Sequence, residues 1–109
     1  MDNNKINTFM GFVIRTGRYR ICVNAVATLK KAELMIVCHT ASENTKKDAE
    51  KLARRLHVPL LQTAGESLES YVHRENAKVM AITDKGLAKA ILENSENHFI
   101  ARNLGDKNG

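Results

Sequence analysis

The strongest evidence for the fold class lies in residues 34–47, LMIVCHTASENTKK. Residues 34–38 form a continuous apolar run, whose length is typical of a strand that is covered on both faces. Cap-type residues follow at 40–45, and the apolar residues beyond them repeat at helical spacing: Ala49, Leu52, Ala53 and Leu56. The stretch therefore predicts a buried strand followed by an amphipathic helix that reaches His57.

The segment before this strand has the same alternating character. Its apolar residues recur at the i, i+3, i+4 and i+7 positions of a helix: Ile6, Phe9, Met10 and Val13. This spacing predicts a helix over about residues 2–15 that ends near Gly17. Residues 18–22 then read as a short strand, and residues 24–30 suit about two turns of helix.

Further strands and helices follow the central helix. The expected elements are a strand at 60–61, a helix at 66–73, a strand at 78–82 and a helix that runs to about 93. Asp84 is expected to cap the last helix. Strands that alternate with helices predict an α/β protein, and we expect a three-layer α/β/α sandwich around a central mixed four-stranded sheet.

Length and composition suit one domain. The chain has 109 residues, of which 43% are hydrophobic and 27% are charged, and these values are ordinary for a globular protein. We expect a single domain at 1–93. Residues 94–109 are polar apart from Phe99, Ile100 and Leu104, and we expect them to form a partly disordered tail.

The two cysteines indicate a reducing compartment. Cys22 and Cys38 each lie in an apolar stretch and belong to no CxxC or Cys/His ligand spacing, so we expect buried free thiols in a cytoplasmic protein. The apolar runs are far shorter than the roughly 18 residues that a membrane span requires, and no membrane partner is expected.

Positive charge is concentrated in the first third of the chain. Residues 3–32 hold six basic residues and no acid, a charge of +6, whereas the rest of the chain holds eleven basic and twelve acidic residues, a charge of −1. The densest part is 15–20, RTGRYR. Such a segment favours a polyanionic partner, and the alternative is a solvated basic face without a ligand.

The residues of this basic segment are suited to nucleic acid. Arg15, Arg18 and Arg20 carry guanidinium groups that fork to phosphate oxygens. Tyr19 supplies a ring on which a base can stack, and Gly17 allows the backbone to come close to a ligand. Asn24, at the start of the next helix, combines a donor and an acceptor, and its alternative role is an ordinary helix cap.

Signals of catalysis are weak. The four histidines occur singly and form no HExxH or HxH arrangement: His39, His57, His73 and His98. No glycine-rich phosphate loop is present. Cys38 and His39 are neighbours on a predicted strand and should point to opposite faces. We therefore expect no catalytic residues, no metal site, no cofactor and no small-molecule substrate.

Two blocks of the sequence resemble a known family. The order of elements, with 34–47 followed by Val79-Met80-Ala81-Ile82-Thr83-Asp84-Lys85-Gly86-Leu87-Ala88, is similar to the ribosomal L-seven-Ae/L-thirty-e family of kink-turn RNA-binding proteins. Residues 41–45 are especially like its small bacterial-type members. The resemblance covers roughly residues 8–92 and implies an α/β fold that binds RNA.

The family also implies where RNA is held. Its members grip RNA with a Gly-x-Asn-Glu stretch after the first strand, and the corresponding residues here are Cys22-Val23-Asn24-Ala25. Asn24 matches, whereas the family's Gly and Glu are replaced by Cys22 and Ala25, and its later basic residue by Thr28. A second family contact comes from the loop before the fourth strand, here residues 73–77, which contains Arg74.

The sequence thus predicts a non-catalytic protein that binds structured RNA, with ribosomal RNA as one candidate. The predicted contacts are Arg15, Gly17, Arg18, Tyr19, Arg20, Asn24 and Arg74. One alternative is a protein-interaction or regulatory module on the same fold that has lost RNA binding. Another is a stand-alone relative of the RNA-binding domain of RNA-modifying enzymes, which would need a catalytic partner.

Overall fold

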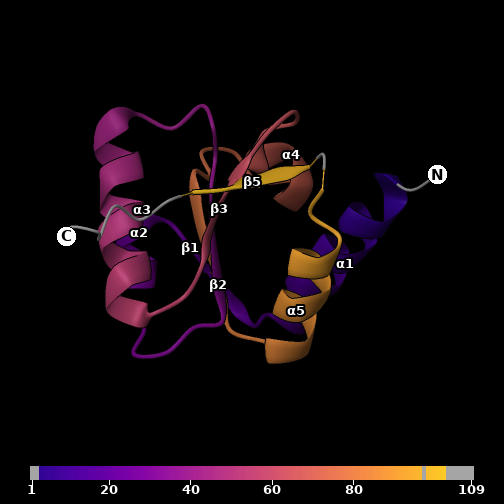
Figure 1. Cartoon of the computed structure of the whole chain (residues 1–109), viewed down its shortest axis with the longest axis horizontal. Helices are drawn as coiled ribbons and strands as arrows, with labels where there is room; N and C mark the ends of the chain where they lie inside the picture. The colour runs from indigo at the N-terminus through magenta and orange to yellow at the C-terminus, as the bar shows by residue number, and fades with distance from the viewer. Residues whose placement is uncertain (1–2, 97, 103–109) are drawn as a thin grey trace.

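Helices and strands alternate along the chain in the computed structural model, which describes residues 3–96 and 98–102 (Figure 1). The helices are α1 (Asn3–Thr16), α2 (Val23–Ala27), α3 (Glu43–Leu56), α4 (Leu68–Val72) and α5 (Lys85–Glu93). The strands are β1 (Tyr19–Ile21), β2 (Leu34–Val37), β3 (Leu60–Thr63), β4 (Val79–Ile82) and β5 (Phe99–Ala101). The predicted mixed α/β fold is confirmed.

The strands form one mixed sheet in the order β1-β4-β2-β3-β5. β2 pairs in parallel with β3, with Met35 opposite Leu60, and antiparallel with β4, with Ile36 opposite Met80. β1 is antiparallel to β4, and β5 is antiparallel to β3. β1 and β5 are therefore the two edges of the sheet.

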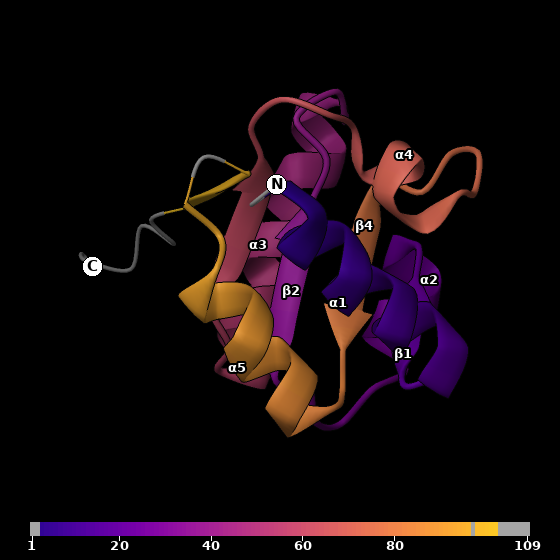
Figure 2. The same cartoon turned by 90° about the vertical axis from the view of Figure 1, so that its right-hand side faces the viewer.

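Apolar side chains cover both faces of the central strand. Ile36 points into a cluster that also contains Met10 of α1 and Ile91 of α5, whereas Met35 and Val37 pack with Ala53 of α3. Figures 1 and 2 show α1, α4 and α5 on one side of the sheet and α2 and α3 on the other. All four β2 residues are buried, as the continuous apolar run predicted.

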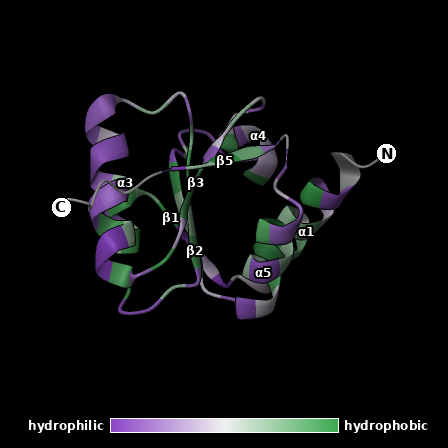
Figure 3. Ribbon diagram, in the orientation of Figure 1, coloured by the Kyte–Doolittle hydropathy of each residue, from purple (hydrophilic) through white to green (hydrophobic). Residues whose placement is uncertain are grey.

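Two helix caps follow the sequence prediction. The Ser42 hydroxyl accepts a hydrogen bond from the Thr45 N–H at 3.1 Å and begins α3, which ends at His57 in the left-handed conformation. The Asp84 carboxylate accepts from the Leu87 N–H at 2.9 Å and begins α5. Polar residues colour the outer face of α3 in Figure 3. This amphipathic pattern explains why α3 packs with only one face on the sheet.

The number of strands differs from the prediction. Five strands are present where four were expected, because β5 lies in the segment predicted to be a disordered tail. Phe99 is only 5% exposed, and its ring contacts that of Tyr71 at a centroid distance of 5.4 Å. Burial of this one aromatic side chain, together with pairing to β3, orders the segment. Residues 103–109 of the predicted tail lie outside the described residues.

Two elements differ in length from the prediction. β3 extends to Thr63 rather than ending at Leu61, and α2 ends at Ala27 instead of about residue 30.

Within the described ranges, no helix combines the length and the apolar character that a membrane span needs.

Candidate nucleic-acid interface

The predicted contact residues gather along the β1 edge of the sheet. β1 has only β4 as a neighbour, so its other side is open. The C-terminal end of α1 leads into one end of this strand and the first turn of α2 leaves the other. Arg15, Gly17 and Arg18 lie at the first end, Asn24 lies at the second, and Arg20 lies between them.

The first end is built on a left-handed glycine. Gly17 has φ +72°, and its N–H donates to the carbonyl oxygens of Val13 and Ile14 at 3.2 and 3.3 Å. This conformation terminates α1 and turns the chain into β1. Arg15 lies over the Phe12 ring, with its guanidinium carbon 5.6 Å from the ring centroid.

Of the three arginines at the β1 edge, Arg15, Arg18 and Arg20, Arg18 has an acidic neighbour. Its guanidinium is 3.9 Å from the Asp84 carboxylate, and its side chain is 68% exposed. The Asp84 side chain is 24% exposed, and because water screens the exposed guanidinium at this distance the pair contributes little to stability. Among the described residues, no carboxylate lies within 4 Å of the charged groups of Arg15 or Arg20.

The side chains of β1 divide between the two faces of the sheet. Tyr19 is half-buried and packs on the cluster under α1, which also contains Ile21. Because neighbouring residues on a strand point in opposite directions, Arg20 projects on the side that carries α2 and α3. Arg20 is exposed, and one of its guanidinium nitrogens donates to the Tyr19 carbonyl oxygen at 2.9 Å. Tyr19 and Arg20 therefore do not share one face.

The second end of the edge contains an exposed cysteine. Cys22 was predicted to be buried, but it is exposed and precedes α2 with φ +88°. The prediction failed because the apolar run ends with the chain turning out of the sheet. Asn24 is also exposed. It lies in the first turn of α2 rather than before it, and α2 has no side-chain cap.

The loop that contains Arg74 approaches this second end. Cys22 N–H donates to the Val79 carbonyl oxygen at 2.9 Å, which places the start of α2 next to the residues that precede β4. His73 and Asn76 have φ +57° and +62° and give the loop its two tight bends. Arg74 is exposed. Asn24 and Arg74, which are 50 positions apart in the sequence, thus lie at the same end of the molecule.

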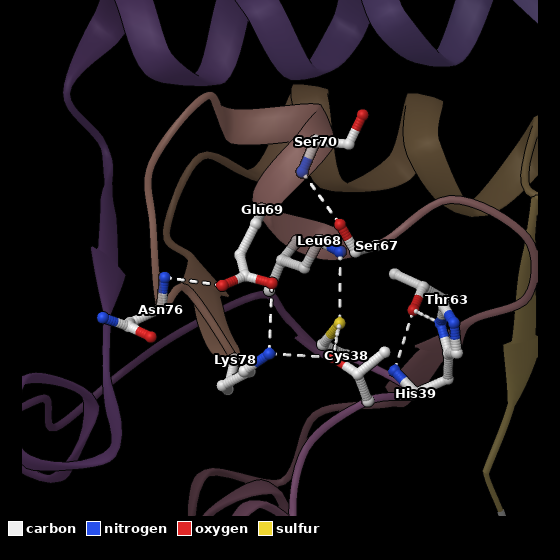
Figure 4. A network of polar contacts seen from close by, with 10 residues as sticks. Cys38, His39, Thr63, Ser67, Leu68, Glu69, Ser70, Asn76 and Lys78 are labelled. Carbon is white, nitrogen blue, oxygen red and sulfur yellow. Dashed lines mark hydrogen bonds and ion pairs between the residues drawn. The ribbon is translucent and has the colours of Figure 1, made fainter.

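A polar network holds the Arg74 loop (Figure 4). The Glu69 carboxylate accepts from the Asn76 N–H at 2.6 Å and from Lys78 Nζ at 3.1 Å. The hydrogen bond from Lys78, followed by that from Asn76, holds the pKa of Glu69 below its ordinary value. Lys78 Nζ also donates to Thr40 Oγ1 at 2.8 Å, which joins the loop to the end of β2.

Cys38 connects the same network to α4. Its Sγ is 3.1 Å from Thr40 Oγ1 and accepts from the Leu68 N–H at 3.3 Å. Burial raises the pKa of this thiol, but the hydrogen bonds from Thr40, Leu68 and Thr63 together hold it below its ordinary value. The side chain is fully buried. Its contacts identify it as a hydrogen-bond acceptor at the start of α4.

The hydrogen bonds of His39 go to Thr63. Its Nδ1 is 2.7 Å from Thr63 Oγ1, and its backbone N–H donates to the same oxygen at 2.9 Å. The sequence did not reveal this cluster because Thr63 and Lys78 lie 24 and 38 positions from their partners. Within residues 3–96 and 98–102, no three His, Cys, Asp or Glu side chains gather in a way that could hold a metal ion.

Comparison with known proteins bears on the fold. No protein-family model and no curated protein matches the chain. A solved structure of a protein with unknown function from Bacillus halodurans C superposes with a TM-score of 0.69 at 18% identity. The match covers 83% of this chain and 95% of the other. At this identity the similarity shows a shared fold and carries no statement about a ligand.

Proposed function

We propose that this protein is a non-catalytic RNA-binding module on a three-layer α/β/α fold. The observation that carries the proposal is the run of exposed guanidinium groups, Arg15, Arg18 and Arg20, along an open edge of the sheet. They belong to the segment 3–32, which contains six basic residues and no acid. A surface of this kind is suited to a phosphate backbone.

The arrangement of the edge supports contact with successive phosphates. Arg18 and Arg20 are two residues apart, which is about 6.6 Å in an extended strand. Planar guanidinium groups bind phosphate oxygens through paired N–H donors. Because the Arg18 guanidinium is exposed and lies 3.9 Å from Asp84, this weak pair can exchange for a phosphate at little cost.

The second end of the β1 edge supplies groups that can form hydrogen bonds with bases as well as contact phosphates. The Asn24 carboxamide is exposed and carries both a donor and an acceptor, which suit a base edge. Arg74 lies at the same end on a loop held by Glu69. The resemblance to kink-turn binders agrees with this assignment, since the family uses the corresponding two segments. We therefore propose structured RNA as the partner.

Salt dependence of RNA binding tests the phosphate contacts. Three contacts predict a slope of about −2 in the logarithm of affinity against the logarithm of salt on single-stranded RNA. Combined replacement Arg18→Ala and Arg20→Ala should flatten the slope by about 1.4 on every RNA sequence. The matched control is Lys47→Ala with Lys51→Ala, which removes the same charge from exposed positions on α3 and should leave the slope unchanged.

Asn24→Ala separates base reading from phosphate contact. Its loss should cost about 1–3 kcal/mol on a preferred structured RNA and little on random RNA, because phosphate contacts remain. If the arginine pair, Asn24→Ala and the lysine control all leave RNA binding unchanged, the β1 edge is a solvated basic face, and the protein-interaction alternative takes the place of RNA binding.

A further inference from the structure

A cleft of about 370 Å³ lies between α1 and the segment that leads through α4. Its volume falls within the range of small-ligand sites, about 300–1,000 Å³. The residues that line it on the two sides are Asn7, Gly11 and Ile14, and Glu66, Ser70 and Tyr71. The lining combines an apolar part with a few polar groups, which is the usual composition of a ligand site.

Gly11 gives the cleft its width. It lies in the middle of α1, where glycine is a poorer helix former than alanine. Its φ is not positive, and a Cβ built on it meets no atom within 4 Å. Neither backbone conformation nor crowding therefore calls for glycine at this position. The missing side chain instead leaves open space in the cleft wall.

A carboxylate lines the opposite wall. The Ser70 hydroxyl donates to Glu66 Oε1 at 2.9 Å and orients the group, and no donor from the described residues reaches Oε2. Figure 4 shows Ser70 at the side of α4 that faces α1. Burial, and then the negative charge of Glu66, raises the pKa of Tyr71, which agrees with a carboxylate close to the ring. The wall thus presents a charged acceptor above the buried Tyr71, which is only 6% exposed and packs on Phe99.

We propose that this cleft binds one guanine base. Guanine presents two adjacent N–H donors, at N1 and N2, beside the carbonyl oxygen O6. The Glu66 carboxylate accepts from the two donors, and the Asn7 carboxamide donates to O6 from the α1 side. The half-buried Ile14 supplies apolar contact for the ring, and the edge of the buried Tyr71 closes the floor of the cleft. Adenine offers an acceptor where guanine has N1–H, and uracil offers a single N–H between two carbonyls, so neither pairs with a carboxylate in this way.

The base can come from a free guanine nucleotide or from an unpaired guanosine in RNA. The RNA source rests on the proposed function, since it requires that RNA lie against the neighbouring surface. His73 lines the cleft, and the exposed Arg74 is the next residue of the chain. A guanidinium group is suited to the phosphate of a nucleotide. Unstacked bases held by their Watson–Crick edges are a common mode of RNA recognition.

Titration of the full chain with GMP, AMP, CMP and UMP, followed by amide NMR shifts, tests the inference. GMP should bind at least about tenfold more tightly than AMP, with shifts at Gly11 and around Glu66. Glu66→Gln should remove the preference, because an amide replaces one acceptor with a donor. Gly11→Leu should abolish binding by filling the cleft without lowering the melting temperature, since leucine is a better helix former than glycine. The control Lys47→Leu adds the same side chain on α3 and should leave GMP binding intact.

Binding of RNA measured in parallel identifies the source. A preference for guanosine-containing RNA that Gly11→Leu removes assigns the cleft to RNA. GMP binding without any RNA binding keeps the cleft as a free-nucleotide site and refutes the proposed function. Equal binding of all four nucleotides overturns the inference. So does RNA binding without guanosine preference when GMP does not bind, and that result leaves the function of the β1 edge standing.

Discussion

Cys22 donates its backbone N–H to the carbonyl oxygen of Val79 at 2.9 Å, one residue beyond the last paired residue of β1. To make this bond and then enter α2, Cys22 adopts φ +88° and ψ +146°. This region of conformational space suits glycine and strains a residue with a Cβ. Glycine is therefore the residue that would adopt this conformation without strain.

Replacement of Cys22 by glycine should therefore stabilise the protein. Relief of the backbone strain outweighs the extra freedom that glycine gains in the unfolded chain, and we expect a net gain of about 1 kcal/mol in the free energy of unfolding. Urea unfolding of the Cys22→Gly and Cys22→Ala variants measures it. Cys22→Ala keeps the Cβ and should show no gain, and equal stability of the two variants would contradict the explanation.

Gly11 and Gly17 should respond in opposite ways to alanine. A Cβ meets no atom within 4 Å at either position, so only the backbone distinguishes them. Gly17→Ala places a residue with a Cβ in the left-handed conformation that Gly17 adopts at φ +72°, and it should destabilise the protein by about 1 kcal/mol. Gly11→Ala lies within α1 and should stabilise it by about 0.5–1 kcal/mol. Thermal melts of the two variants provide the comparison.

The Arg74 loop should become less stable in acid. Since the pKa of Glu69 is lower in the folded protein, its contribution is present above its ordinary pKa and is lost as the pH falls through the folded value. The difference in urea midpoint between wild type and Glu69→Ala should be largest near neutral pH and should vanish below the folded pKa. Faster hydrogen exchange at the Asn76 amide should accompany the substitution at neutral pH.

Glu75→Ala is the matched control for this experiment. Glu75 lies in the same loop, is exposed, and has no ion pair or hydrogen bond with the described residues. The urea midpoint of this variant should equal that of the wild type at neutral and acidic pH. A Glu69→Ala difference that persists unchanged below the folded pKa would show that the carboxylate charge does not hold the loop.

β5 should depend on one arginine. Arg102 forms an ion pair with Glu50 of α3 and a hydrogen bond with Gln62 of β3. Arg102→Ala removes both interactions. A hydrogen bond to a charged group contributes about 1.5 kcal/mol, so its loss should make β5 open about tenfold more often. Hydrogen exchange reports this at the Ala64 amide, which donates to His98 beside β5. Amides of β2 should be unaffected, and a uniform acceleration across the sheet would contradict a local role.

Much of the secondary structure follows from local sequence. The apolar run at 34–38 contains β2, and Ser42 and Asp84 begin α3 and α5 as their residue types predict. Caps and hydrophobic periodicity act over a few residues, so they are readable without the fold. β5 was missed because only Phe99 of its three residues is buried, and one buried position has no periodicity to detect.

For the candidate sites, too, some features depend on local sequence and others on the tertiary fold. The sequence by itself determined the fold class and the charge of the first third of the chain, because both depend on residues close together. Tertiary structure alone decided that β1 is an edge strand, that Arg74 joins Asn24 at one end, and that Gly11 faces Glu66 across a cleft. Each of these three relationships brings together residues that are 50 or more positions apart in the sequence. Their proximity arises from strand order and helix packing, which depend on burial of the whole core rather than on any local pattern.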